Sequence, residues 1–170
     1  MTGGKIKFNG KLLSVFIKKE RLPNGNPVTL ELVKHPGAAL VIPFLSAGSI
    51  LMLRQYRPVI KSYLYELPAG TLKKNERPSV CAKREIIEET GYAASKLKML
   101  GWIYPVPGYS TEKINIFAGM GLKKMSRARP EEDEMIEVRA MTRQKVRSLF
   151  RSGRITDAKT ISSLAMVGWL

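Results

Sequence analysis

The sequence predicts an α/β or α+β fold in which helices pack on a mixed β-sheet. Apolar segments with strand composition occur along most of the chain, and one segment near the middle, residues 78–91, has the features of a helix. Such a mixture is typical of a sandwich with a sheet in its centre. The chain has 170 residues, of which 44% are hydrophobic, and this is enough for one domain with its own core. We expect this domain to span residues 37–170, preceded by a small element of residues 1–36.

The small N-terminal element is predicted to be an antiparallel sheet. Residues 5–8, 11–20 and 28–33 have strand composition, and the sequence LPNGN at residues 22–26 favours a turn between the last two. A sheet of three short strands is too small to enclose a core. We therefore expect it to pack on another surface.

The next element is predicted to be a hairpin of residues 38–44 and 50–56, followed by a short strand at residues 63–67. The uncharged stretch Pro36–Leu53 is long enough to raise the possibility of a membrane-spanning helix. However, Pro43 and the turn sequence SAGS divide this stretch, and both halves are rich in Val, Ile and Leu. We therefore predict two strands and no membrane span.

The central helix is predicted to begin near Pro78 and to end at Gly91. Proline suits the first turn of a helix because its nitrogen carries no hydrogen there to be satisfied. Glycine suits the end because it adopts the left-handed conformation without a Cβ clash. Three further strands are predicted after this helix, at residues 98–104, 114–122 and 135–141.

Two more helices are predicted at the end of the chain. Thr142 is a candidate N-cap for a helix that runs through Phe150, and Asp157 is a candidate N-cap for a helix that runs to the C-terminus. Together with the strands, they complete the helical layers expected of a sandwich.

Acidic residues gather in two places, although the chain as a whole is strongly basic. It has 29 Lys and Arg against 14 Asp and Glu, a formal net charge of +15. Nine of the 14 acidic residues lie in two groups, which are Glu66, Glu76, Glu85, Glu88 and Glu89, and Glu131, Glu132, Asp133 and Glu134. A uniformly solvated surface would not sort its charges in this way. We therefore expect both acidic groups to be sites.

Cysteine and histidine are too few for a zinc site or an internal disulfide. Cys81 and His35 are the single residues of their types, so a Cys/His metal site is excluded. The N-terminal sequence MTGGKIKFNG lacks the apolar run of a signal peptide. We expect a cytoplasmic protein in which Cys81 is a reduced core residue.

Three glutamates occupy one face of the central helix, close to its C-terminal end. Glu85, Glu88 and Glu89 are spaced i, i+3 and i+4, so their carboxylates share a face. Negative charges there oppose the helix dipole and repel one another, so this arrangement does not serve helix stability. A divalent cation would resolve the conflict, because converging carboxylates form a hard oxygen site suited to Mg²⁺.

The spacing of residues around this helix resembles the Nudix box. The pattern is Gly70, five residues, Glu76, seven residues, and then the sequence REIIEETGY, with Ile86 and Tyr92 at its hydrophobic positions. The box covers 23 residues. The resemblance implies the Nudix fold, an α/β/α sandwich with a mixed sheet, and hydrolysis of a nucleoside diphosphate linked to another moiety.

Segments outside the box resemble the ADP-ribose pyrophosphatase branch of this family. They include LRQYRP at residues 53–58, ELPAG at residues 66–70 and YPVPGYSTE at residues 104–112. The marker of that branch is a proline about fifteen residues beyond the box, and Pro107 lies fifteen residues after Tyr92. The resemblance implies hydrolysis of the diphosphate of ADP-ribose to AMP and ribose 5-phosphate.

The resemblance also implies a metal site. Glu85 and Glu89 match the principal metal ligands, Glu88 supports them, and the carbonyl of Ala69 matches a backbone ligand. Arg84 matches the arginine that orients the catalytic glutamates, and its alternative role is that of a solvated helix residue. The expected cation is Mg²⁺, with Mn²⁺ as the alternative.

The remaining site residues are expected on loops and strand ends. Glu134, in the acidic loop after the box, is the best match for the general base, although an acidic run is usually a solvated loop. The substrate-binding candidates are Arg57, Arg54, Glu66, Pro107 and Glu112. The planar fork of Arg57 suits phosphate oxygens, whereas a solvated strand end explains Arg54 equally well. Phe8, Tyr104 and Tyr109 are candidates for stacking on adenine, although such residues more often belong to a core.

We expect a homodimer, because the N-terminal sheet occupies the place where the ADP-ribose branch builds its dimer contact. Two alternative functions remain open. The substrate could be another nucleoside diphosphosugar or a dinucleotide polyphosphate, since the box does not define the attached group. A non-catalytic RNA-binding Nudix module is favoured by the charge of +15. Such modules usually lose catalytic glutamates, which this chain retains, so we expect an enzyme without a nucleic-acid partner.

Overall fold

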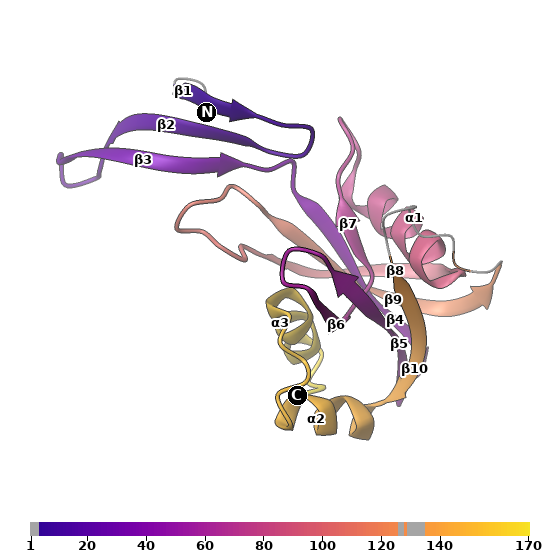
Figure 1. Ribbon diagram of the computed structural model, residues 1–170. Helices are drawn as coiled ribbons and strands as arrows, with labels where there is room; N and C mark the ends of the chain where they lie inside the picture. Colours follow the sequence, from indigo (N-terminus) through magenta and orange to yellow (C-terminus); the bar gives the residue numbers. More distant parts are fainter. Residues whose placement is uncertain (1–3, 126–127, 129–134) are drawn as a thin grey trace.

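The computed structural model describes residues 4–125, 128 and 135–170. A seven-stranded mixed sheet forms its centre, and helices lie on both faces of that sheet. A separate three-stranded sheet at the N-terminal end projects from one side of this sandwich (Figure 1). The predicted fold class, an α/β/α sandwich with a small N-terminal antiparallel sheet, is confirmed.

The N-terminal sheet consists of β1 (Lys5–Asn9), β2 (Ser14–Arg21) and β3 (Pro27–Lys34), in that order and antiparallel. Its attachment to the rest of the molecule uses backbone hydrogen bonds at Val33. The Val33 N–H donates to the carbonyl of Tyr109 at 2.7 Å, and its carbonyl accepts from the N–H of Thr111 at 3.0 Å. This sheet therefore adjoins the loop that carries the sequence YPVPGYSTE.

The central sheet has the order β10-β5-β4-β9-β8, with β6 paired to β5 and β7 paired to β4. Its strands are β4 (Ala38–Ser46), β5 (Ser49–Arg57), β6 (Ser62–Glu66), β7 (Ala69–Thr71), β8 (Tyr92–Ile103), β9 (Ile114–Lys124) and β10 (Ile136–Thr142). The pairing of β4 with β9 is parallel, whereas β4 pairs with both β5 and β7 in the antiparallel sense. The sheet is therefore mixed, as expected.

Strand β4 lies in the middle of the sandwich and divides its core in two. Leu40 and Ile42 belong to the cluster that contains residues of the two C-terminal helices, and Ala39 and Val41 belong to the cluster around the central helix. Successive side chains of a strand point to opposite faces. Because both faces are covered, β4 is apolar throughout its buried part instead of alternating with polar residues.

The helix starts are those that the sequence predicts, but the last helix ends at Met166 and does not run to the C-terminus. Helix α1 (Pro78–Thr90) has proline in its first turn, and Gly91 follows it with φ of 75°, where its N–H donates to the Ile87 carbonyl at 2.8 Å. Helix α2 (Arg143–Arg151) is capped by Thr142, and α3 (Ala158–Met166) is capped by Asp157. No helix in the described part of the chain is both long and apolar enough to cross a membrane.

Two strands differ from the sequence prediction. Strand β8 begins at Tyr92, directly after α1, whereas we expected a strand from residue 98. Its first residues, YAASK, have little strand propensity, and pairing with β9 from Tyr92 opposite Lys124 imposes the extended conformation. Strand β7 was not predicted, because three residues are too few to show an alternating pattern.

Candidate active site

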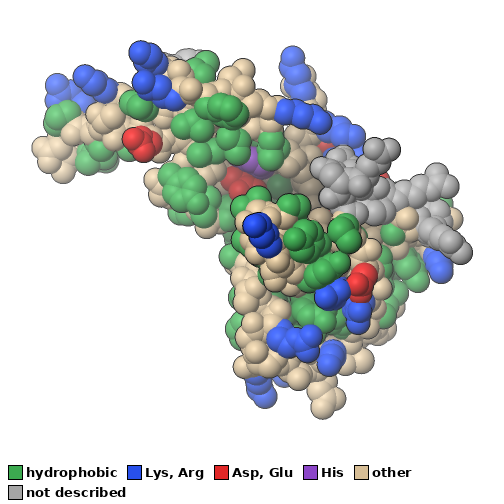
Figure 2. All heavy atoms as spheres, in the orientation of Figure 1, with side chains coloured by type: hydrophobic (Ala, Val, Ile, Leu, Met, Phe, Trp, Pro, Cys, Tyr) green, Lys and Arg blue, Asp and Glu red, His purple; other side chains and the backbone are tan. Residues whose placement is uncertain are grey.

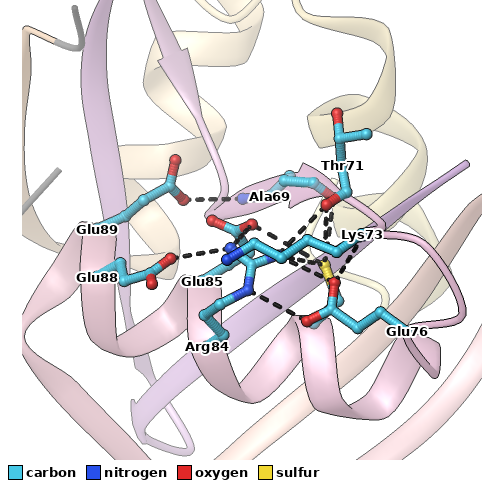
Figure 3. Close-up of polar contacts among 10 residues, drawn as sticks. Ala69, Thr71, Lys73, Glu76, Arg84, Glu85, Glu88 and Glu89 are labelled. Carbon is cyan, nitrogen blue, oxygen red and sulfur yellow. Dashed lines mark hydrogen bonds and ion pairs between the residues drawn. The ribbon is translucent and has the colours of Figure 1, made fainter. Parts of the chain in front are cut away.

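The site is built where the short strand β7 crosses α1. Gly70 of β7 lies so close to α1 that a Cβ at this position would be 1.8 Å from Oε1 of Glu85. Any side chain at residue 70 would therefore occupy the space of the Glu85 carboxylate. Glu85 and Glu89 are both buried, and Glu88, one turn away on the same helix, is more exposed. Figure 3 shows these three side chains on the face of α1 that is turned toward Ala69 and Thr71.

Arg84 joins the glutamates of this site through its guanidinium group. Its Nη1 donates to Glu85 at 2.5 Å and to Glu88 at 2.9 Å. Its Nε and Nη2 each donate to the carboxylate of Glu76 at 3.2 Å (Figure 3). Burial disfavours the charged guanidinium, but the hydrogen bonds to Glu76 and Glu88 and the nearby charge of Glu85 raise the pKa of Arg84. Arg84 therefore stays charged, and the expectation that it is a solvated helix residue does not hold.

Several carboxylates gather where β7 meets α1. Glu89 accepts a hydrogen bond from the N–H of Ala69 at 2.9 Å. Three further carboxylates, those of Glu76, Glu85 and Glu88, bind the Arg84 guanidinium. Carboxylate and carbonyl oxygens are the ligands that hard divalent cations prefer, and a cation would offset the repulsion between neighbouring carboxylates. The chemistry of the donor set thus fits Mg²⁺ or Mn²⁺.

The carboxylates are not assembled around a single point, however. Within the described ranges, no group of three His, Cys, Asp or Glu side chains is arranged to hold a metal ion. Arg84 instead bridges Glu85 and Glu88. The backbone group of Ala69 that contacts a glutamate is its N–H, whereas the sequence led us to expect its carbonyl as a ligand.

Cys81 lies behind these carboxylates, in the core under α1. Its Sγ is 3.4 Å from the carbonyl oxygen of Gly70 and 3.9 Å from Oε1 of Glu85. Burial, with the negative charge of Glu85 nearby, raises the pKa of this thiol to about 12. Cys81 is therefore a neutral, buried group at neutral pH, as the sequence predicts.

A second network holds Arg57. Its Nε and Nη2 donate to the two oxygens of Glu66 at 2.7 and 2.6 Å, and Lys159 of α3 donates to the same carboxylate. Burial would raise the pKa of Glu66, but its hydrogen bond with Arg57 and the charge of Lys159 outweigh burial and lower it. Lys159 also donates to Asp157 at 2.9 Å. Glu66 is 1% exposed, so it acts on the site through Arg57 and does not reach the solvent itself.

Two cavities open on either side of β7. The larger, of about 840 Å³, is lined by Lys11, Leu12, Pro36, Arg57, Ala69, Gly70, Thr71, Leu72, Lys73, Lys74, Arg84, Glu85 and Glu88. The smaller, of about 330 Å³, is lined by Ala38, Arg57, Ala69, Gly70, Thr71, Pro105, Glu112, Ile114, Asp157, Ala158 and Lys159. Arg57 and the three residues of β7 line both cavities. A ligand that contacts Arg57 can therefore extend into either one.

The other candidate residues are placed differently. Glu112 lines the smaller cavity and lies 3.8 Å from Nδ1 of His35. Pro107 lines neither cavity. Arg54 also lines neither; it forms an ion pair with Glu137 at 2.7 Å and lies over the ring of Tyr63. It lies within β5, paired with Glu137 of β10 and Tyr65 of β6, and a role in substrate binding stays a prediction.

The three aromatic candidates are exposed on the surface. Phe8, Tyr104 and Tyr109 are 56%, 48% and 57% exposed, so none of them is a core residue. Glu134 and its acidic neighbours, residues 131–133, lie outside the described residues, and the role of Glu134 stays a prediction.

Sequence reasoning did not identify Lys159, Lys11, Lys73 or Lys74 as site residues. Lys159 reaches Glu66 across 93 residues of sequence, and Lys11 belongs to the turn between β1 and β2. A local pattern cannot predict such long-range contacts. Lys73 and Lys74 lie inside the box, and their closeness to Gly70 could have drawn attention to them.

The sequence was compared with models of known protein families. Residues 34–164 match the family model for the NUDIX domain. The chain belongs to the NUDIX domain family.

Relatives of this NUDIX protein cover nearly the whole chain. It is 38% identical over 154 residues to an "ADP-ribose pyrophosphatase" of Bacillus subtilis (strain 168), with 90% of this chain and 83% of the relative covered. It is 36% identical over 155 residues to a "Methanol dehydrogenase activator" of Bacillus methanolicus, with 91% and 84% covered. The solved structure of an "ADP compounds hydrolase" shares the fold, with a TM-score of 0.79, 20% identity, and 98% of this chain and 93% of that chain covered.

Proposed function

We propose that this NUDIX protein hydrolyses the diphosphate of ADP-ribose to AMP and ribose 5-phosphate, with Mg²⁺ as its cofactor. The observation that carries the proposal is that one cavity is lined by Glu85 and Glu88 of the box, by β7 and by Arg57. Carboxylates for a cation and a guanidinium for phosphate are the groups that diphosphate hydrolysis needs. The choice of ADP-ribose rests on the name of the B. subtilis relative and on the segments beyond the box.

In the reaction, a water oxygen forms a bond to one phosphorus and the bond from that phosphorus to the bridging oxygen breaks. The bridging oxygen leaves with the other phosphate, and a carboxylate takes the proton of the water. Arg57 binds diphosphate oxygens while Glu66 and Lys159 hold its side chain in place. Arg84 holds Glu85 against β7. We assign the general base to Glu134.

The residues that would hold the cation are Glu85, Glu88 and Glu89, with the carbonyl of Ala69. When bound, Mg²⁺ neutralises negative charge on the diphosphate and offsets the repulsion between neighbouring carboxylates. Mn²⁺ has the same preference for oxygen ligands and is the alternative.

We also propose that the protein is a cytoplasmic homodimer whose N-terminal sheet packs on the partner. Ile6 and Phe8 of β1 are 55% and 56% exposed, and apolar side chains on a small sheet are stabilised when a second surface covers them. The free, buried thiol of Cys81 is compatible with a reducing compartment.

The proposal is tested by chromatography of the products from a panel of nucleoside diphosphate compounds incubated with Mg²⁺. We expect AMP to appear fastest from ADP-ribose. The panel includes GDP-mannose, because a "GDP-mannose pyrophosphatase" of Salmonella is 32% identical to this chain over 133 residues. Faster release of GMP or UMP from such sugars would reject ADP-ribose as the preferred substrate. Salt-sensitive retention on RNA without hydrolysis of any nucleotide would reject the enzyme.

Substitution of single glutamates tests which of them bind the cation. Glu85→Gln and Glu89→Gln should each abolish hydrolysis and weaken Mg²⁺ binding measured by calorimetry, because the neutral amide is a poor ligand for a hard cation. Glu31→Gln on β3 removes the same charge at a distance from the site and should leave both measurements unchanged. Full activity of Glu85→Gln would contradict the assignment of the box as the catalytic centre.

A further inference from the structure

Three lysines line the larger cavity and not the smaller one. Lys11 comes from the turn between β1 and β2, and Lys73 and Lys74 come from the segment that follows β7. Lys and Arg side chains are gathered where this turn and this segment approach each other (Figure 2). The N-terminal sheet thus contributes a positive charge to the same cavity that the box lines. We call Lys11, Lys73 and Lys74 the lysine rim.

The lysine rim differs from the other basic residues of the cavity in its lack of ion pairs. Arg57 is bound to Glu66, and Arg84 is bound to Glu76, Glu85 and Glu88. Among the described residues, no carboxylate lies within 4.0 Å of an ammonium group of the lysine rim. The rim therefore presents ammonium groups that form no direct ion pair with a described carboxylate, although the charge of Lys73 also acts on Glu76.

Arg57 and the lysine rim could each bind a separate anionic group of one ligand. Arg57 and β7 line both cavities and so mark the position of the bridging diphosphate. Lys73 is two residues beyond Thr71, and its backbone N–H donates to Glu76 at 2.9 Å. The three lysines line the larger cavity alone, whereas Arg57 lines both, so the rim lies on the side of the diphosphate position that faces away from the smaller cavity. The diphosphate therefore leaves the rim free for a second group of the same ligand.

We propose that the lysine rim binds a phosphate monoester that the substrate carries in addition to its bridging diphosphate. This inference rests on the proposed function, because it places the diphosphate at Arg57. An ammonium group binds phosphate as a compact point charge, and a monoester at neutral pH carries close to two negative charges. The bond that is hydrolysed stays that of the diphosphate, and the monoester is not transferred.

The additional phosphate could lie at either end of the substrate. It could be attached to the ribose of the adenosine or to the distal ribose, and the rim would recognise the same chemistry in both. ADP-ribose 2′-phosphate and ADP-ribose 1″-phosphate represent these two cases. The one that gains affinity shows which half of the substrate occupies the larger cavity.

The experiment compares ADP-ribose with these two compounds in steady-state kinetics. We expect one of them to have a KM lower by about tenfold, as for one charge-assisted contact, with a similar kcat. The double variant Lys73→Gln/Lys74→Gln should remove this advantage, and Lys11→Gln should reduce it. The control Lys96→Gln/Lys98→Gln removes the same charge from exposed positions of β8 and should retain it.

Two results would overturn the proposal. One is that neither phosphorylated compound has a lower KM than ADP-ribose. The other is that Lys73→Gln/Lys74→Gln weakens all three substrates by the same factor, since the rim would then only steer anions toward the site. If none of the three is hydrolysed, the proposed function fails instead. Calorimetric binding of the three compounds then still decides whether the rim recognises the additional phosphate.

Discussion

Replacement of Gly70 by alanine tests whether the close contact between β7 and α1 sets the position of Glu85. The added Cβ would lie 1.8 Å from Oε1 of Glu85 and 2.1 Å from its Cδ. Because such contacts are essentially never shorter than 3.0 Å, the carboxylate must move by at least about 1.2 Å. A misplacement of about 1 Å at a catalytic group costs roughly 10²-fold in rate. We therefore expect Gly70→Ala to lower kcat for ADP-ribose by about 10²-fold or more.

The same substitution should affect folding much less than activity. The atoms that clash belong to the end of a side chain, which can rotate away at a cost of about 1–2 kcal/mol for the hydrogen bonds it loses. For a chain of 170 residues, this corresponds to a fall in Tm of about 2–8 °C. Gly48→Ala is the matched control, because a Cβ there meets no atom within 4 Å. A Gly70→Ala variant with nearly the kcat of the wild type would refute the assignment of Glu85.

Three further predictions concern the base, the Arg57 network and the N-terminal sheet. If Glu134 is the general base, Glu134→Gln should lower kcat by roughly 10²–10⁴-fold with little change in Mg²⁺ binding, and near-normal turnover would assign the base elsewhere. The pKa of Glu66 is lowered from 4.5 in the folded protein, so its stabilisation is complete above that pH and is lost as the pH falls through the folded pKa. Glu66→Gln should therefore lower the free energy of unfolding by about 2–3 kcal/mol at pH 7 and by less at pH 3 in urea titrations. Light scattering at micromolar concentration should give the mass of a dimer, and deletion of residues 4–34 should give a monomer; a monomeric full chain would reject the proposed contact.

Much of the fold could be predicted from the sequence because its signals are local. Residues 38–44 and 50–56 are apolar runs separated by turn residues, and they form the buried strands β4 and β5. Helix α1 begins and ends at residues with strong positional preferences. The first half of β8 could not be predicted, since its small residues become a strand only through pairing with β9.

The part of the candidate site that lies on α1 could be predicted from the sequence, because helical spacing alone determines which residues share a face. The spacing of Glu85, Glu88 and Glu89 requires that they share a face of α1, and the structure has this arrangement. The approach of Gly70 to Glu85 depends on the pairing of β7 with β4, which no local pattern encodes. The contact from Lys159 to Glu66 depends on the packing of α3 on the completed sheet, so it also could not be read from the residues nearby.

The link between α3 and the end of β6 has a consequence for synthesis on the ribosome. Lys159 and Thr160 follow their partners Glu66 and Leu67 by 93 residues, which corresponds to about 5–20 s of elongation. During this interval the Glu66 carboxylate has only Arg57 as a partner, and the Leu67 N–H lacks its acceptor. Arg57 therefore acquires its final support only after α3 has been synthesised. A nascent chain can display the complete box well before the opposite side of the substrate cleft is in place.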